Sequence, residues 1–160
     1  HSLIDKTLIY KKLVAQIIKN SSLEDLFDSD VLYAAIIQHE SIQHNKQLKC
    51  YRSAAHLVEN SVVIADFSSG KEFQGFGRFI PYQLYPHALY AVHILPKGGD
   101  TLNISCGINP WNKVDQNRKH LGHFFSKHFY GGGHAFVAGG RVEKNKLTQK
   151  LKLLVEYLVG

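Results

Sequence analysis

The sequence predicts an α/β (α+β) fold: a mixed β-sheet of about four or five strands, flanked by helices and preceded by an N-terminal helical segment. Short runs rich in β-branched residues, one segment of strict polar–apolar alternation, and amphipathic stretches between and after them lead to this prediction. The 160 residues fit one domain. With 44% hydrophobic and 20% charged residues, the composition is that of a globular protein.

The first third of the chain has helical periodicity. Isoleucine and leucine recur every four residues between positions 9 and 17, which predicts a helix with a broad apolar face. Asp30 can cap a second helix from Val31 to His44. A third helical stretch is expected from Lys46 to Val58. The apolar faces of these helices are compatible with a homodimer.

Three strands are expected next. Val62 to Phe67 is a β-branched run closed by a Ser-Ser-Gly turn signal. His87 to Leu95 is nearly all apolar and is typical of a buried central strand. Thr101 to Gly107 alternates, with Leu102, Ile104 and Cys106 directed to one face. The last two strands form a hairpin with one polar face.

The C-terminal part is predicted to be helix, strand and helix. Gln116 to Phe129 places three large apolar side chains four residues apart, on one helical face. Ala135 to Val142 is expected to be the last strand. The final helix has a leucine stripe, formed by Leu147, Leu151, Leu154 and Leu158.

Composition narrows the class of protein. No apolar run approaches the roughly 18 residues needed to cross a bilayer. Cys50 and Cys106 are too few for a disulfide scaffold. The formal net charge of +6 favours encounter with phosphates, nucleic acid or anionic surfaces. We therefore expect a cytoplasmic protein with no membrane segment and an anionic partner.

The segment with the most chemical information is Gly131-Gly132-Gly133-His134. One glycine is enough to end a helix, so three in a row suggest a further role. Consecutive glycines allow main-chain N–H groups to converge into a nest that holds a phosphate. The preceding helix would direct the negative end of its dipole here, so binding would also need a cation. His134 is the nearest candidate.

This Gly-Gly-Gly-His loop, between a helix and a strand of small residues, resembles the C-terminal DHH-associated (substrate-binding) domain of the DHH phosphoesterase superfamily. The similarity covers roughly residues 61–142 and is with exopolyphosphatase-like and oligoribonuclease-like members. The resemblance implies a metal-dependent hydrolase whose N-terminal domain holds two manganese or magnesium ions. The chain has no Asp-His-His triplet. We therefore expect no catalytic residue, metal ligand or cofactor within it.

A second segment supports the resemblance. Ser105 to Asn112 occupies the place where many members have a Ser-x-Arg-Ser phosphate-binding strand. Here the arginine is missing, and the Asn-Pro-Trp-Asn version is similar to an exopolyphosphatase-like subgroup. The candidate substrate- and phosphate-binding residues are Gly131, Gly132, Gly133, His134, Ser105, Asn109, Lys113, Arg78 and Arg141.

The resemblance implies a division of the chain. Residues 1–58 would be a helical connector from a missing N-terminal metal domain, and residues 59–160 the substrate-binding domain. The expected ligands are nucleotides and other phosphorylated small molecules, short oligonucleotides or polyphosphate. The expected partner is the missing metal domain, in the same chain.

Two other interpretations remain open. The protein could be a non-enzymatic module that binds RNA or nucleotide through the glycine-rich loop and the region of Phe76, which resembles the aromatic strand of an RNA-recognition module. Against that, Arg78 interrupts the aromatic pattern and Pro81 is unfavourable in a central strand. Four histidines, at 120, 123, 128 and 134, suggest zinc, but no acidic or cysteine partner accompanies them. Packed or solvated histidines are the favoured interpretation.

Overall fold

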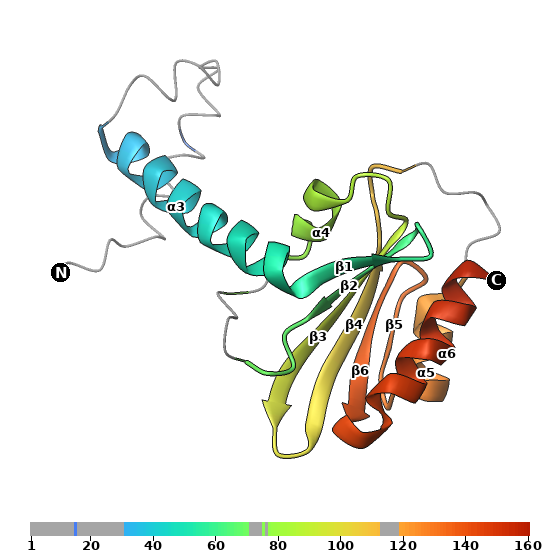
Figure 1. Ribbon diagram of the computed structural model, residues 1–160. Coiled ribbons are helices and arrows are strands. Elements are labelled where there is room, and N and C mark those ends of the chain that lie inside the picture. The colour runs from blue at the N-terminus through green and yellow to red at the C-terminus, as the bar shows by residue number, and fades with distance from the viewer. Residues whose placement is uncertain (1–14, 16–30, 71–74, 76, 113–118) are drawn as a thin grey trace. The chain divides into compact units, whose positions relative to one another are not determined.

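The computed structural model describes residue 15 and residues 31–70, 75, 77–112 and 119–160 (Figure 1). The chain divides into two compact units, His1–Asn45 and Lys46–Gly160. The periodic segment at 9–17 and the expected cap Asp30 lie outside the described residues, apart from residue 15. The division predicted at residue 58 is of another kind, because it separates a connector from a substrate-binding domain. It stays a prediction.

One long helix, α3 (Val31–Ala54), stands where two helices were predicted. The predicted break at Asn45 is wrong, because a single asparagine without glycine or proline costs too little helix propensity to end a helix. The helix also ends earlier than expected. Ala55–Val58 forms strand β1 and pairs antiparallel with β2 (Val62–Asp66).

The turn between β1 and β2 explains this difference. Glu59 and Asn60 both have left-handed φ values, 49° and 53°, as in the primed turns that reverse hairpins. The N–H of Ser61 donates to the carbonyl of Val58 at 3.2 Å and closes the turn. Pairing with β2 therefore overrides the local helical preference of the residues before the turn.

The sheet of the described residues has six strands in the order β1-β2-β3-β4-β6-β5. The pair β2–β3 is parallel and the other pairs are antiparallel, so the predicted mixed α/β fold is confirmed. The strand count exceeds the expected four or five because β1 and the two-residue β5 were not anticipated. The remaining elements are β3 (Tyr90–Gly98), β4 (Thr101–Ile108), β5 (Gly132–Gly133), β6 (Val137–Glu143), α4 (Ile80–Leu84), α5 (Leu121–His128), the 3-10 turn Lys144–Lys146 and α6 (Leu147–Val159).

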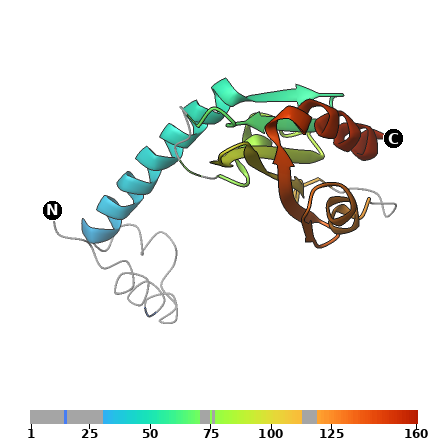
Figure 2. The ribbon, with the colours of Figure 1, turned by 90° about the horizontal axis from the view of Figure 1, so that it is seen from below.

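One face of the sheet packs against α5 and α6, which lie on the same side of it (Figure 2). The predicted inward residues of β4 are all buried in this core. The predicted stack on α5 is confirmed as well, since Leu121, Phe125 and Phe129 are fully buried. The rings of Phe124 and Tyr157 stack at 4.1 Å and join α5 to α6.

The opposite face is covered only in part. The end of α3 and the short helix α4 pack over β2 and β3, where Tyr51, Val63 and Ile80 form a second core. His93 of β3 lies in this region, with its ring 5.7 Å from that of Tyr51. Burial, and then the nearby charge of Arg78, lower the pKa of His93 to about 4. No helix among the described residues covers the part of this face over β4, β6 and β5.

The glycines of β5 allow a matched stability test. Gly133 has φ +150° and a Cβ there would collide with the backbone of Val137 and Ala138, whereas a Cβ at Gly132 would meet nothing within 4 Å. We expect Gly133→Ala to lower the free energy of unfolding by roughly 1–3 kcal/mol. Gly132→Ala should change it by about 0.5 kcal/mol or less. Urea titrations measure both, and equal losses would contradict the assigned strand geometry.

His93 should make stability depend on pH. Because its pKa is lower in the folded protein, the unfolded chain binds the extra proton between pH 6.5 and about 4. The contribution is therefore present above pH 6.5 and is lost as the pH falls toward 4, with a slope approaching about 1.4 kcal/mol per pH unit. In His93→Gln this component should disappear. Thermal unfolding from pH 7 to 4 checks this, and parallel curves for the two proteins would contradict it.

Candidate functional site

Strand register brings small residues into a row on the partly covered face, beyond the end of α3 and α4. Ser105 of β4 pairs with His93 on one side and with Gly139 of β6 on the other, and Gly139 pairs with Gly132 of β5. Neighbouring strands lie about 4.8 Å apart, so Ser105 and Gly132 are about 10 Å apart. We call Ser105, Gly132 and Gly139 the open strip. Because none of them has a large side chain, the backbone there stays accessible.

The glycine-rich segment follows β6 as an edge strand. A Cβ at Gly131 would collide with Gly139 and Gly140, and one at Gly140 would collide with Phe129. The N–H of His134 donates to the carbonyl of Val137 at 2.8 Å. The expected nest of converging N–H groups is therefore replaced by strand β5, because the missing side chains serve the close approach of two backbones.

His134 lies at the opposite end of α5 from the one expected. The segment leaves the C-terminal end of the helix at Phe129 and runs back along it. At the other end, the N–H of Gly122 donates to the carbonyl of His134 at 2.9 Å and the N–H of Leu121 to that of Ala135 at 3.2 Å. The first N–H groups of α5 are therefore already paired with these carbonyls, and the unfavourable dipole end expected from the sequence lies beside Gly131 and not beside His134. The His134 residue is exposed.

The two arginine candidates flank the open strip. Arg141 of β6 pairs with Asn103, and strand alternation places it on the same face as Ser105. Arg78 precedes α4 and is held in place through its neighbour, since the N–H of Gly77 donates to the hydroxyl of Tyr51 at 3.2 Å. Both arginines are exposed. Their charges would attract an anion to this face.

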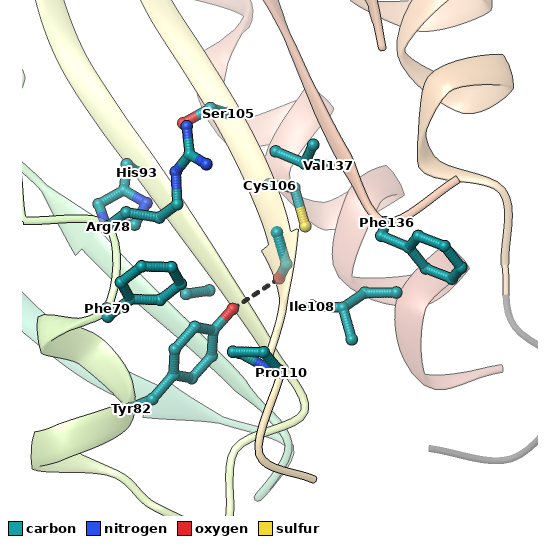
Figure 3. Close-up of a pocket in the computed structure, with 12 residues that line it drawn as sticks. Arg78, Phe79, Tyr82, His93, Ser105, Cys106, Ile108, Pro110, Phe136 and Val137 are labelled. Carbon is teal, nitrogen blue, oxygen red and sulfur yellow. Dashed lines mark hydrogen bonds between the residues drawn. The ribbon is translucent and has the colours of Figure 1, made fainter. Parts of the chain in front are cut away.

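A cavity of about 240 Å³ opens between α4 and the start of β6 (Figure 3). Arg78, His93 and Ser105 contribute its polar groups, and Phe79 and Phe136 are among its apolar ones. The hydroxyl of Tyr82, also in the lining, donates to the carbonyl of Gly107 at 2.8 Å. Burial raises the pKa of Tyr82 well above its usual value, so the phenol stays neutral.

One of the candidates, Asn109, is not brought to this face. Asn109 is buried, and its amide nitrogen donates to the carbonyls of Ala88 at 2.8 Å and Pro86 at 3.2 Å. Its side-chain oxygen accepts the N–H of Trp111 at 3.0 Å. The structure thus gives Asn109 a role in holding the loop after β4. Lys113 and Phe76 lie outside the described residues.

Among the cavity residues that sequence reasoning did not assign to the phosphate site are His93, Phe79 and Phe136. His93 falls inside an apolar strand, and pairing with Ser105 in strand register was the signal that would have placed it on the polar face. Phe79 belongs to the aromatic segment that the RNA-binding interpretation singled out, whereas Phe136 carries no such signal. The two phenylalanines are far apart in sequence, and only the tertiary fold brings them to one cavity.

The described residues do not fit a metal centre. Among them, no group of three or more His, Cys, Asp or Glu side chains is placed to hold an ion. His120 and His123 stack at 3.7 Å, and the Nδ1 of His120 accepts the N–H of His123 at 3.1 Å as a helix cap.

No helix among the described residues has the length and apolar character to cross a membrane.

Comparison with known proteins gives a likeness of fold. No protein-family model matches the sequence, and no curated protein matches it. Among solved structures, the pGpG-specific phosphodiesterase PggH from Vibrio cholerae is 15% identical with a TM-score of 0.78, over 98% of this chain and 52% of that one. An exopolyphosphatase-related protein from Bacteroides fragilis is 12% identical with a TM-score of 0.51, over 93% of this chain and 42% of that one.

The chain therefore spans about half the length of these two proteins or less. At such low identity the likeness shows the fold alone. The chain shares its fold with a protein described as a phosphodiesterase and with one described as exopolyphosphatase-related, which is the kind of fold that the Gly-Gly-Gly-His segment predicted.

Proposed function

We propose that residues 59–160 form the substrate-binding part of a metal-dependent phosphoesterase, with residues 1–58 as the connector to its metal domain. The expected reaction is hydrolysis of phosphate esters or anhydrides of nucleotides, short oligonucleotides or polyphosphate. The observation that carries the proposal is the shared fold with a protein described as a pGpG-specific phosphodiesterase, over nearly the whole chain. The second similar structure is described as exopolyphosphatase-related, which supports the same class.

In this proposal the phosphate lies on the open strip. Of the three glycines Gly131 to Gly133, Gly132 leaves room for its oxygens, since a Cβ there would meet nothing within 4 Å. The hydroxyl of Ser105 donates a hydrogen bond, and His134 adds an imidazole N–H donor. Arg141 and Arg78 offset the negative charge. Asn109 is left out, because its amide is already used by the backbone.

The role of this chain is then to bind and orient the substrate. Positioning a reacting group supplies a large part of an enzyme's rate enhancement, so a binding domain can control turnover without touching the metal. The described residues do not fit a metal ion. Manganese or magnesium bound in the other domain would activate the water that attacks the phosphorus. The residues of this chain hold the phosphorus in place and stabilise its charge.

A non-enzymatic nucleotide- or RNA-binding module is the second candidate. The exposed rings of Phe79 and Phe136 in one cavity with Arg78 favour it, because aromatic and cationic side chains together bind single-stranded nucleic acid. Manganese-dependent hydrolysis by the full-length protein separates the two. Hydrolysis supports the phosphoesterase, and tight binding without turnover supports the module.

Replacing His134 tests the phosphate site. In the full-length protein, His134→Ala should lower kcat/KM for a phosphodiester substrate by about 10- to 100-fold, the cost of one charge-assisted hydrogen bond. Manganese affinity should not change. His56→Ala is the matched control, since His56 is exposed on β1 at the other edge of the sheet. Unchanged turnover in His134→Ala would remove the proposal.

The open strip can be filled without disturbing the fold. Gly132→Val places two methyl groups where a Cβ meets open space, so thermal stability should be retained. We expect the Kd for a phosphorylated ligand to rise at least tenfold, because the branched side chain occupies the place proposed for the phosphate. Calorimetric titration and thermal unfolding of the same samples measure the two effects. Wild-type affinity in a stable Gly132→Val protein would show that the ligand lies elsewhere.

A further inference from the structure

We propose that the cavity between α4 and the start of β6 takes the base of a nucleotide, which makes nucleotides or short oligonucleotides the substrate class in preference to polyphosphate. This inference rests on the proposed function, in which a phosphate lies on the open strip. It adds a second subsite, lined by Phe79, Phe136, Arg78 and Ser105.

The cavity offers two exposed aromatic side chains that come from anchored segments of the chain. Phe79 and Phe136 lie on opposite sides of it in Figure 3, and they are 46% and 56% exposed. Trp111 packs edge-to-face on Phe79 at 5.3 Å. On the other side, the carbonyl of Phe136 accepts the N–H of Ile108 at 3.0 Å. Exposed rings on an anchored backbone are suited to packing against a flat aromatic ligand.

The charges of the lining favour a ligand that carries hydrogen-bond acceptors. Arg78 is the one charged residue of the twelve that line the cavity, and none of the twelve is acidic. His93 is neutral near pH 7, because burial and the charge of Arg78 lower its pKa to about 4. The lining thus presents the guanidinium of Arg78 and the hydroxyl of Ser105 to the ligand. A base that carries carbonyl oxygen or ring nitrogen acceptors, such as guanine, matches a guanidinium fork.

The cavity adjoins the place proposed for the phosphate. Phe136 follows His134 by two residues, and two residues span at most about 7 Å. Ser105 belongs both to the lining and to the open strip. A ligand that joins a phosphate to a flat ring through a sugar would therefore reach both subsites at once.

Polyphosphate fits this pair of subsites poorly. Each of its units carries a charge, and a second or third unit in the cavity would place oxyanions against phenylalanine, isoleucine, proline and valine side chains. Burying a charged group without partners is costly. The volume of about 240 Å³ is below that of usual small-molecule pockets, which agrees with one base rather than a larger ligand.

Calorimetric titration with GMP, ribose 5-phosphate and tripolyphosphate tests the inference. GMP should bind at least tenfold more tightly than ribose 5-phosphate, which has the same phosphate and sugar without the base. Phe136→Ala and Phe79→Ala should each raise the Kd of GMP by about 5- to 100-fold, the range of one base–aromatic stack. The Kd of ribose 5-phosphate should not change in either variant.

Two variants serve as controls. Phe136→Leu keeps apolar bulk and should fold normally while still weakening GMP binding. Leu153→Ala, at a partly exposed apolar residue on α6, should leave every Kd unchanged. Equal affinities of GMP and ribose 5-phosphate, or wild-type GMP affinity in both phenylalanine-to-alanine variants, would overturn the inference.

The same titrations separate this inference from the proposed function. If ribose 5-phosphate and GMP bind equally well and His134→Ala weakens both, the phosphate site stands and the base subsite fails. If His134→Ala leaves GMP binding intact while the phenylalanine variants weaken it, the base subsite stands and the phosphate site fails. Tripolyphosphate that binds more tightly than GMP would overturn the assigned substrate class.

Discussion

The contact on which the site depends is the close approach of the glycine-rich segment to β6. Gly131, Gly133 and Gly140 each lie where a Cβ would collide with the opposing backbone, so the contact requires glycine on both sides. It is this contact that returns the chain along α5 and carries His134 to the helix N-terminus. The open strip and the position of the imidazole are thus two results of one backbone packing.

The second determinant is the uneven covering of one sheet face. The end of α3 and α4 protect β2 and β3, where large apolar residues are buried, and they stop before β4. The cavity forms at this boundary, with Tyr82 and Phe79 from the α4 side and Ser105 from the sheet. His93 lies at the same boundary and is neutral near pH 7, so Arg78 stands without a competing positive charge from it.

Sequence reasoning predicted the elements whose periodicity is set by a buried face. The alternation of β4 and the four-residue spacing on α5 are direct consequences of packing against one core, and both are confirmed. The errors fall where a distant contact decides. β1 forms because β2 pairs with it, and Asn109 is buried because carbonyls of the loop 86–88 lie beside it. The three consecutive glycines indicated that another group comes close to the backbone there. The sequence alone did not reveal that this group is the backbone of β6.

The parallel pairing of β2 with β3 has a consequence for how the chain folds. Within the described sheet the β1–β2 and β3–β4 hairpins can close from neighbouring residues, but β2 and β3 meet only after the intervening chain, including α4, has crossed over. Pairing between strands that are distant in sequence slows folding. The α4 side of the cavity, which carries Phe79, therefore depends on a pairing that neither hairpin supplies alone, and the cavity exists only when both hairpins have joined.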